Sequence, residues 1–275
     1  MMPTRRHVLA LAAAAAVTPA TVAAGPASRL IDDRWTRFGS AGDPDHGAWA
    51  KILQKHLATG TPSGVNLFDY AAADRGAIGA YVDALTAVAP TGLSRDAAMA
   101  YWLNLYNAAT VWVVLEEYPV DSIKEVRGGL FNTGPWTDKL VTVEGQALSL
   151  DDIEHGILRP IWQDPRIHYA VNCASIGCPN LFPTPFTAAT LERMMDEGAR
   201  AYVAHPRGAE VAGGRLTVSS IYDWFVEDFG GNDAGVIAHL RRYATGGKAD
   251  ALAGVDRIAG DRYDWALNDT ASATT

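Results

Sequence analysis

The segment AAMAYWLNLYNAATVWVVL, residues Ala97–Leu115, is apolar on nearly every face that a helix would present. A helix of this kind is buried in the middle of a domain. Ser94 stands just before the segment, where a hydroxyl can cap a helix, and Pro119 follows it, where a helix ends. The segment therefore predicts a long central helix around which the rest of the chain packs.

The other patterned segments are short, and no repeat, heptad or linker separates them. Four have apolar residues at helical spacing and are predicted helices: residues 45–57, 74–88, 187–204 and 234–244. Residues 140–148 predict a β-hairpin and residues 215–218 a strand. We expect a helix-rich α+β fold, a single domain over residues 25–270 with a small sheet packed around the buried central helix, and a frayed tail over residues 271–275.

The first 24 residues have the composition of a secretory signal peptide. A charged start containing Arg5 and Arg6 precedes an alanine-rich apolar run that ends at a small residue, Ala24. The paired arginines favour the twin-arginine type of export signal, with an ordinary Sec signal as the alternative. We expect cleavage after Ala24 and a periplasmic or secreted domain.

The charge balance argues against two classes of partner. The chain has 23 basic and 31 acidic residues, and removing the signal makes it more acidic. An acidic chain without a basic run is a poor ligand for nucleic acid or anionic membrane, and no later segment is apolar for long enough to insert. We expect a small molecule or a cell-envelope component as the partner, bound in a cleft that the glycine-rich stretch 128–136 covers as a loop.

Both cysteines of the chain lie in the segment DPRIHYAVNCASIGCPNL, residues 164–181. In an exported protein, two cysteines predict a disulfide, here between Cys173 and Cys178. The bridge closes only if residues 174–177 fold back, and so small a ring stabilises a fold by only about 2 kcal/mol. Such a bridge shapes a loop more than it holds the fold together.

One hypothesis is a thiol enzyme with Cys173 as its nucleophile. Ile167–Val171 has the composition of a short strand, and along a strand His168 would lie roughly 16 Å from Cys173 on the opposite face. His155, from the preceding segment, is therefore the better candidate for the base.

A second hypothesis is an acid–base enzyme that catalyses hydrolysis or group transfer while the cysteines stay bridged. Residues 152–158 predict a short helix with a capping box at Ser149, and this helix carries Glu154 and His155. Glu154 with His155 or His168 could supply the proton donor and acceptor. The same side chains and the thiols are of types that zinc prefers, but their spacing matches no standard motif, so we predict no metal and no cofactor.

The alternative is a non-catalytic module that binds a ligand or a partner outside the cytoplasm. In that case the disulfide staples a loop, His168 belongs to the core, and Glu154 pairs with a nearby arginine such as Arg166. Four residues are candidates for substrate binding: Asn104, Asn107, Arg166 and Asn172. Because Asn104 and Asn107 are one turn apart on a buried helix, their amides either bond to neighbouring backbone or contact a substrate.

Several blocks of sequence resemble the family called domain of unknown function 547. They are YWLNLYNA from Tyr101, LDDIEH from Leu150, DPRIH from Asp164, the two cysteines, and YDWALN from Tyr263. The blocks follow in order over about residues 95–268. The family name carries no activity, so the resemblance marks these residues as candidates and implies no particular reaction.

Overall fold

The computed structural model describes residues 25–128 and 133–271. The predicted signal peptide, residues 1–24, lies outside the described residues, as do residues 129–132 of the predicted loop and residues 272–275 of the predicted tail. Ala271 is ordered by a hydrogen bond from its N–H to Asp269 Oδ1.

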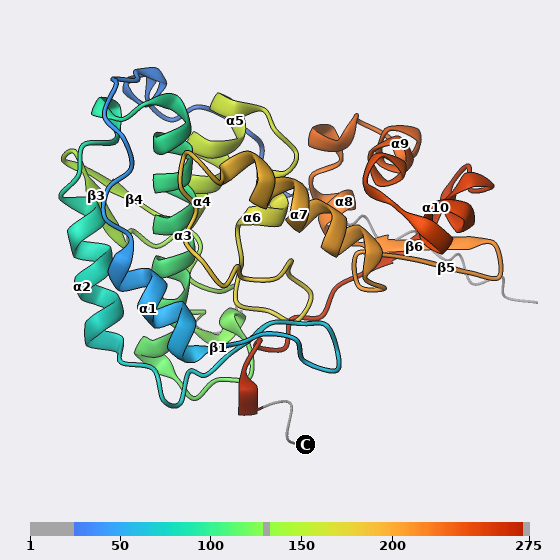
Figure 1. The fold of residues 1–275 in the computed structure, drawn as a ribbon, viewed down its shortest axis with the longest axis horizontal. Helices are drawn as coiled ribbons and strands as arrows, with labels where there is room; N and C mark the ends of the chain where they lie inside the picture. The colour runs from blue at the N-terminus through green and yellow to red at the C-terminus, as the bar shows by residue number, and fades with distance from the viewer. Residues whose placement is uncertain (1–24, 129–132, 272–275) are drawn as a thin grey trace, which may run out of the picture.

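The predicted central helix is α3, Arg95–Glu117. Ser94 caps it by accepting a hydrogen bond from the N–H of Ala97, and its residues are buried almost continuously from Ala97 to Val114. Figure 1 shows helices α1 and α2 on one side of α3 and the segment α4–α6 on the other. The bounds of these helices are α1 Gly47–His56, α2 Arg75–Thr86, α4 Leu150–Ile153, α5 Arg159–Trp162 and α6 Ile167–Ala170.

The strands are short and belong to small sheets of two or three strands. The strands are β1 Leu57–Ala58 with β2 Leu67–Phe68, β3 Val141–Val143 with β4 Gln146–Leu148, and β5 Ala209–Ala212 with β6 Arg215–Ser219 and β7 Ile258–Arg262. All pair antiparallel except β7, which runs parallel to β6. The predicted helix-rich α+β fold is confirmed. None of the described helices has the length and apolarity to cross a membrane.

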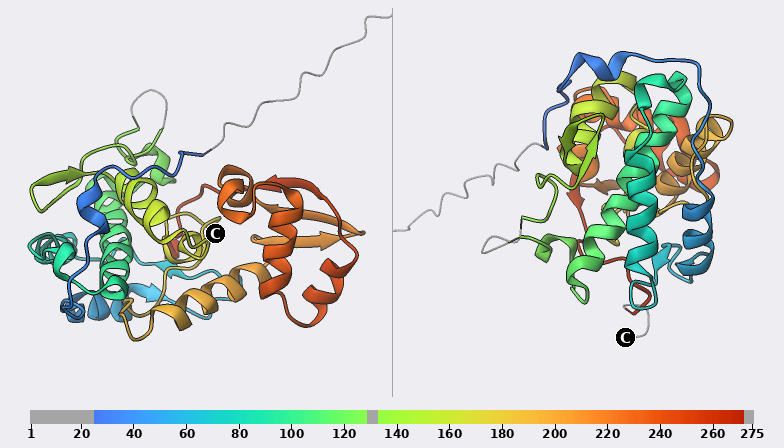
Figure 2. Two further views of the ribbon diagram at one scale, coloured as in Figure 1. Left: turned by 90° about the horizontal axis from the view of Figure 1, so that it is seen from above. Right: turned by 90° about the vertical axis from the view of Figure 1, so that its left-hand side faces the viewer.

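The chain after α6 adds a second apolar cluster to the one around α3. Strands β5–β7 pack there with α7 Leu191–Ala204, α8 Ile221–Trp224, α9 Asp233–Tyr243 and α10 Gly246–Ala253. Figure 2 shows α7 running from the α3 side of the molecule to this sheet, so one helix contributes to both clusters. The sequence placed the start of α7 at Thr187, but the hydroxyls of Thr187 and Thr190 bond to each other in a turn that delays the helix.

The segment after the hairpin is helical for longer than the sequence predicted. The capping box at Ser149 is present and starts α4. A π-helical turn, Glu154–Leu158, then joins α4 to α5, and the helical run ends at Trp162 where Gln163 has a φ of 52°. Pro160 is tolerated in the first turn of α5. Single π-turns inside helices are frequent at functional sites, and this one carries Glu154 and His155.

The strand predicted at Ile167–Val171 is wrong: Ile167–Ala170 form helix α6, and only Val171, after its end, is extended. The N–H groups of Ile167 and His168 donate to the carbonyls of Asp164 and Pro165, and Asp164 also accepts from the N–H of Arg166. This local turn overrides the strand propensity of the β-branched residues. His168 and Cys173 are therefore not separated by the length of an extended strand, as the predicted strand had implied.

Candidate functional site

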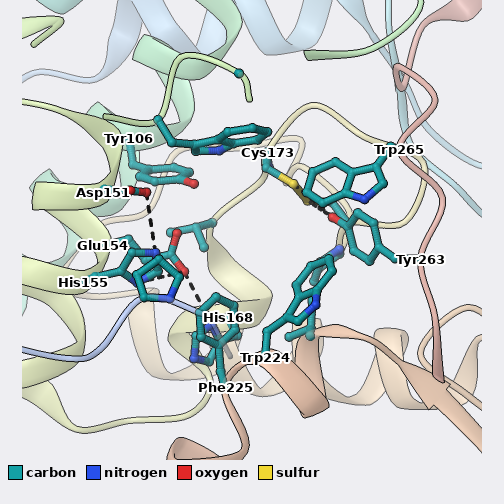
Figure 3. Close-up of a pocket in the computed structure, with 18 of the residues that line it drawn as sticks. Tyr106, Asp151, Glu154, His155, His168, Cys173, Trp224, Phe225, Tyr263 and Trp265 are labelled. Atoms are coloured by element: carbon teal, nitrogen blue, oxygen red, sulfur yellow. Dashed lines mark hydrogen bonds and ion pairs between the residues drawn. A yellow bond between two sulfur atoms is a disulfide. The ribbon is translucent and has the colours of Figure 1, made fainter. Parts of the chain in front are cut away.

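A cavity of about 360 Å³ opens where the two apolar clusters meet (Figure 3). Its walls come from α3, the α4–π segment, the loop after α6, helix α8 and the chain after β7. The lining residues are Gly25, Pro26, Tyr106, Thr133, Gly134, Trp136, Thr137, Asp151, Glu154, His155, His168, Val171, Cys173, Cys178, Pro179, Ile221, Trp224, Phe225, Tyr263 and Trp265.

One side of the cavity is an aromatic wall made of Trp136, Trp224, Tyr263 and Trp265. Trp265 is at its centre, with ring centroids 5.5 Å from Trp224, 4.6 Å from Tyr263 and 5.6 Å from Trp136. These rings are only partly buried, so their free faces are available to a ligand. Aromatic surfaces of this size favour the apolar faces of ligand rings.

The opposite side is an acidic wall made of Asp151, Glu154 and His155 (Figure 3). Asp151 Oδ1 lies 3.7 Å from His155 Nε2, one helical turn away. Burial, together with the charges of Glu154 and Asp152, raises the pKa of Asp151 to about 6. Asp151 can therefore exchange a proton near neutral pH while it faces the cavity.

Behind the acidic wall, His168 bridges two carboxylates. Its Nε2 is 2.6 Å from Asp228 Oδ2, and its Nδ1 is 3.5 Å from Glu154 Oε1. Burial opposes the charge on His168, but the hydrogen bonds with Asp228 and Glu154 prevail and raise its pKa above the usual value. Burial likewise opposes the charge of Glu154, yet His155 and His168, with a hydrogen bond from Tyr106, lower its pKa to about 2.

Arg159 fixes the protonation of His155. Its guanidinium donates through Nε to Asp228 Oδ2 at 2.6 Å and through one terminal nitrogen to the carbonyl of Pro26. The same nitrogen lies 3.0 Å from His155 Nδ1, which must accept because a guanidinium can only donate. Burial lowers the pKa of His155 to about 4, so its ring is neutral with the proton on Nε2, towards Asp151.

The predicted disulfide between Cys173 and Cys178 is present, and both cysteines line the cavity. With Cys173 oxidised, the thiol hypothesis has no free nucleophile in this state of the protein. The other histidine and acid candidates, Glu154, His155 and His168, all line the same cavity. Across residues 25–128 and 133–271, no group of three or more His, Cys, Asp and Glu side chains has an arrangement suited to a metal ion.

The three asparagines proposed for substrate binding do not line the cavity and instead bond to backbone. Asn104 exchanges two hydrogen bonds with the backbone of Phe186, at 2.8 and 3.0 Å. Asn107 donates to the carbonyl of Ala170 and accepts from the N–H of Asn172, at 2.9 and 2.8 Å. Asn172 in turn donates to the carbonyl of Pro179. Asn107 and Asn172 therefore tie the loop of the two cysteines to the central helix, and Asn104 ties the segment at Phe186 to it.

Arg166 does not pair with Glu154, contrary to the pairing expected for the non-catalytic alternative. Its guanidinium bonds to Asp164, Glu192 and Asp196, all within 3.0 Å, and it lies outside the cavity lining. These contacts join the start of α6 to helix α7.

Sequence reasoning missed several residues of the site. Asp151 precedes His155 by four residues, so helical spacing alone could have placed both on one face. Trp224, on α8, lines the cavity, and Asp228, in the turn after α8, pairs with His168; no local pattern in the sequence marks either residue.

A family model described as "Protein of unknown function, DUF547" matches residues 90–203. The match supports the family resemblance that the sequence blocks predicted, and the matched region includes Asp151, Glu154, His168 and both cysteines. No curated protein and no solved structure matches the chain significantly.

Proposed function

We propose that the protein is an acid–base enzyme that catalyses hydrolysis or group transfer on a small ring-containing substrate. One observation carries this proposal: Asp151 and Glu154 face one cavity with pKa values of about 6 and about 2. Two carboxyl groups held in different protonation states in one pocket are a common basis for assigning a proton donor and an ionised partner.

In this proposal Asp151 donates a proton to the leaving group. It is partly protonated near neutral pH and is the least buried member of the acidic wall, with 28% of its side chain exposed. Glu154 stays ionised and stabilises positive charge that develops on the substrate, or orients a water molecule for attack. His155 acts as a positioning residue, because its Nε2–H faces Asp151.

The charges of the site limit the class of substrate. The two cations beside the acidic wall, His168 and Arg159, are already engaged with Asp228 and Glu154. The charge of Glu154 would repel an anionic substrate, and the acidic wall has no unengaged cation to offset this repulsion. The aromatic wall on the other side favours a ring face, so we propose a neutral or cationic ring-containing substrate.

Export is part of the proposal. We propose that residues 1–24 direct the chain to the periplasm or out of the cell. The bridged cysteines support this, because disulfides persist mainly in oxidising compartments.

The test is turnover of a panel of 4-nitrophenyl esters and glycosides by the wild-type chain, Asp151→Asn and the exposed control Asp96→Asn. We expect kcat/KM to fall as the pH rises through about 6, because the donor must be protonated. Asp151→Asn should lower kcat/KM by roughly 10²- to 10⁴-fold, and the control should match the wild type. Full activity in Asp151→Asn contradicts the proposal.

The second candidate, a non-catalytic binding module, is favoured by the aromatic wall alone. It predicts that ligands quench tryptophan fluorescence without being turned over, and that Asp151→Asn binds them as the wild type does.

A further inference from the structure

The two sulfurs of the disulfide differ in exposure and in surroundings. Cys173 is partly exposed in the cavity wall, whereas Cys178 is 4% exposed. Cys178 Sγ accepts from the N–H of Cys173 at 3.0 Å, and the hydroxyl of Tyr263 lies 3.0 Å from both sulfurs. Figure 3 shows the Tyr263 hydroxyl directed towards the bridge.

Donors of this kind stabilise a thiolate more than a disulfide sulfur, because a hydrogen bond to an ionised acceptor is roughly twice as strong as one to a neutral acceptor. The Tyr263 hydroxyl is also 2.8 Å from Ser175 Oγ, so its position is fixed from a second side. The Tyr263 hydroxyl can therefore stabilise a thiolate on either sulfur, and the N–H of Cys173 favours placing that charge on Cys178.

A partly buried cation, Arg207, contacts the same loop. Arg207 makes no ion pair with any carboxylate of the described residues; it donates to the carbonyl of Ile176 at 2.9 Å and to Asn180 Oδ1 at 2.6 Å. Its Nε is buried without a hydrogen-bond partner. A thiolate at Cys178 would bring a negative charge into the loop that Arg207 already contacts through the carbonyl of Ile176.

The loop itself is held in an unfavourable backbone conformation. Ala174, directly after Cys173, has a φ of 59°, a region that residues other than glycine rarely adopt. Asn172 Oδ1 accepts from the N–H of Ala174 at 2.9 Å and holds it there. Strained residues of this kind cluster at functional sites.

We propose that Cys173–Cys178 is a reactive disulfide that exchanges with small-molecule thiols and disulfides in the cavity. A thiolate RS⁻ attacks Cys173 Sγ, the bond between the cysteines breaks, and Cys178 leaves as a thiolate held by Tyr263 and the N–H of Cys173. A second RS⁻ attacks the substrate sulfur of the mixed disulfide and releases RSSR and the Cys173 thiolate. Two thiols lose two electrons, the two cysteines gain them together with the two protons, and a second small disulfide reverses the steps to restore the bridge.

The test uses the full folded chain with 2-mercaptoethanol, and its disulfide form, as the probe. Samples are quenched in acid, their free thiols are alkylated, and the intact mass of the protein is measured by mass spectrometry. The mass gives the number of free thiols and does not depend on the proposed hydrolase activity. We expect the bridge to open without denaturant and Tyr263→Phe to slow opening by about tenfold, the effect of losing one charge-assisted hydrogen bond. Tyr81→Phe is the control, since its buried hydroxyl bonds to His46 outside the cavity lining.

The order of attack is tested with single-cysteine variants whose folding is checked by tryptophan fluorescence. Cys178→Ser should acquire a 2-mercaptoethanol adduct from the small disulfide at least tenfold faster than Cys173→Ser, because only Cys173 is exposed. The proposal is overturned if the wild-type bridge opens only under denaturing conditions. It is also overturned if Tyr263→Phe opens at the wild-type rate. Neither result depends on the folding of a cysteine variant.

Discussion

Replacing Asp228 by asparagine removes one charge from a buried cluster with almost no change in shape. The Oδ2 atom of Asp228 is 2.6 Å from both His168 Nε2 and Arg159 Nε. The side chains of His168 and Arg159 are only 2% and 5% exposed, so water cannot replace the lost carboxylate. Unpairing a buried charge costs about 3–5 kcal/mol, and because 21% of the Asp228 side chain is exposed, we expect about 3 kcal/mol.

The variant should also change how stability depends on pH. In the wild type the raised pKa of His168 contributes stability that is fully present below 6.5 and is lost as the pH rises through its folded value. The lowered pKa values of Asp228 and Glu154 contribute stability that is lost as the pH falls from about 4 towards 2. Stability should therefore be highest between these limits, and Asp228→Asn should flatten both slopes.

The assay is urea unfolding followed by tryptophan fluorescence between pH 3 and pH 9. Asp223→Asn is the matched control, because Asp223 is an exposed carboxylate on α8 and its loss should change the free energy of unfolding by less than about 0.5 kcal/mol. The reasoning is refuted if Asp228→Asn is as stable as that control at pH 6.

Two further variants test the supports of the site. Asn107→Ala should lower the free energy of unfolding by about 2–3 kcal/mol, because it leaves the carbonyl of Ala170 and the N–H of Asn172 buried and unpaired; a urea curve that overlays the wild type would contradict this. Ser149→Ala should lower it by about 1 kcal/mol through loss of the capping box of α4, measured by thermal unfolding, and an unchanged midpoint would show that this cap is dispensable.

The elements that the sequence predicted well are those whose signal is local. The central helix was placed to within a few residues, because apolar residues fill every face and Ser94 and Pro119 mark its ends. The hairpin before Ser149 was predicted from alternation and the Glu144–Gly145 turn, which has positive φ at both residues.

The predictions that failed have two causes: a local turn that overrides strand propensity, and contacts between distant segments. Residues 167–171 have strand propensity, but the turn at Asp164 makes Ile167–Ala170 helical and directs His168 towards Asp228, 60 residues away. The raised pKa of Asp151 arises from burial in the assembled cavity, which no spacing in the sequence records. Trp224 and Trp265 join one wall only because β7 returns parallel to β6.

A carbon-13 NMR titration of the Asp151 carboxyl tests the proposed site most directly, with Asp151→Asn used to assign the resonance. If Asp151 is the proton donor of an acid–base site, its pKa in the folded protein is about 6, and Glu154 remains ionised down to about 2. A pKa for Asp151 near its ordinary value of about 4 would contradict that role, because the group would then be fully ionised at neutral pH.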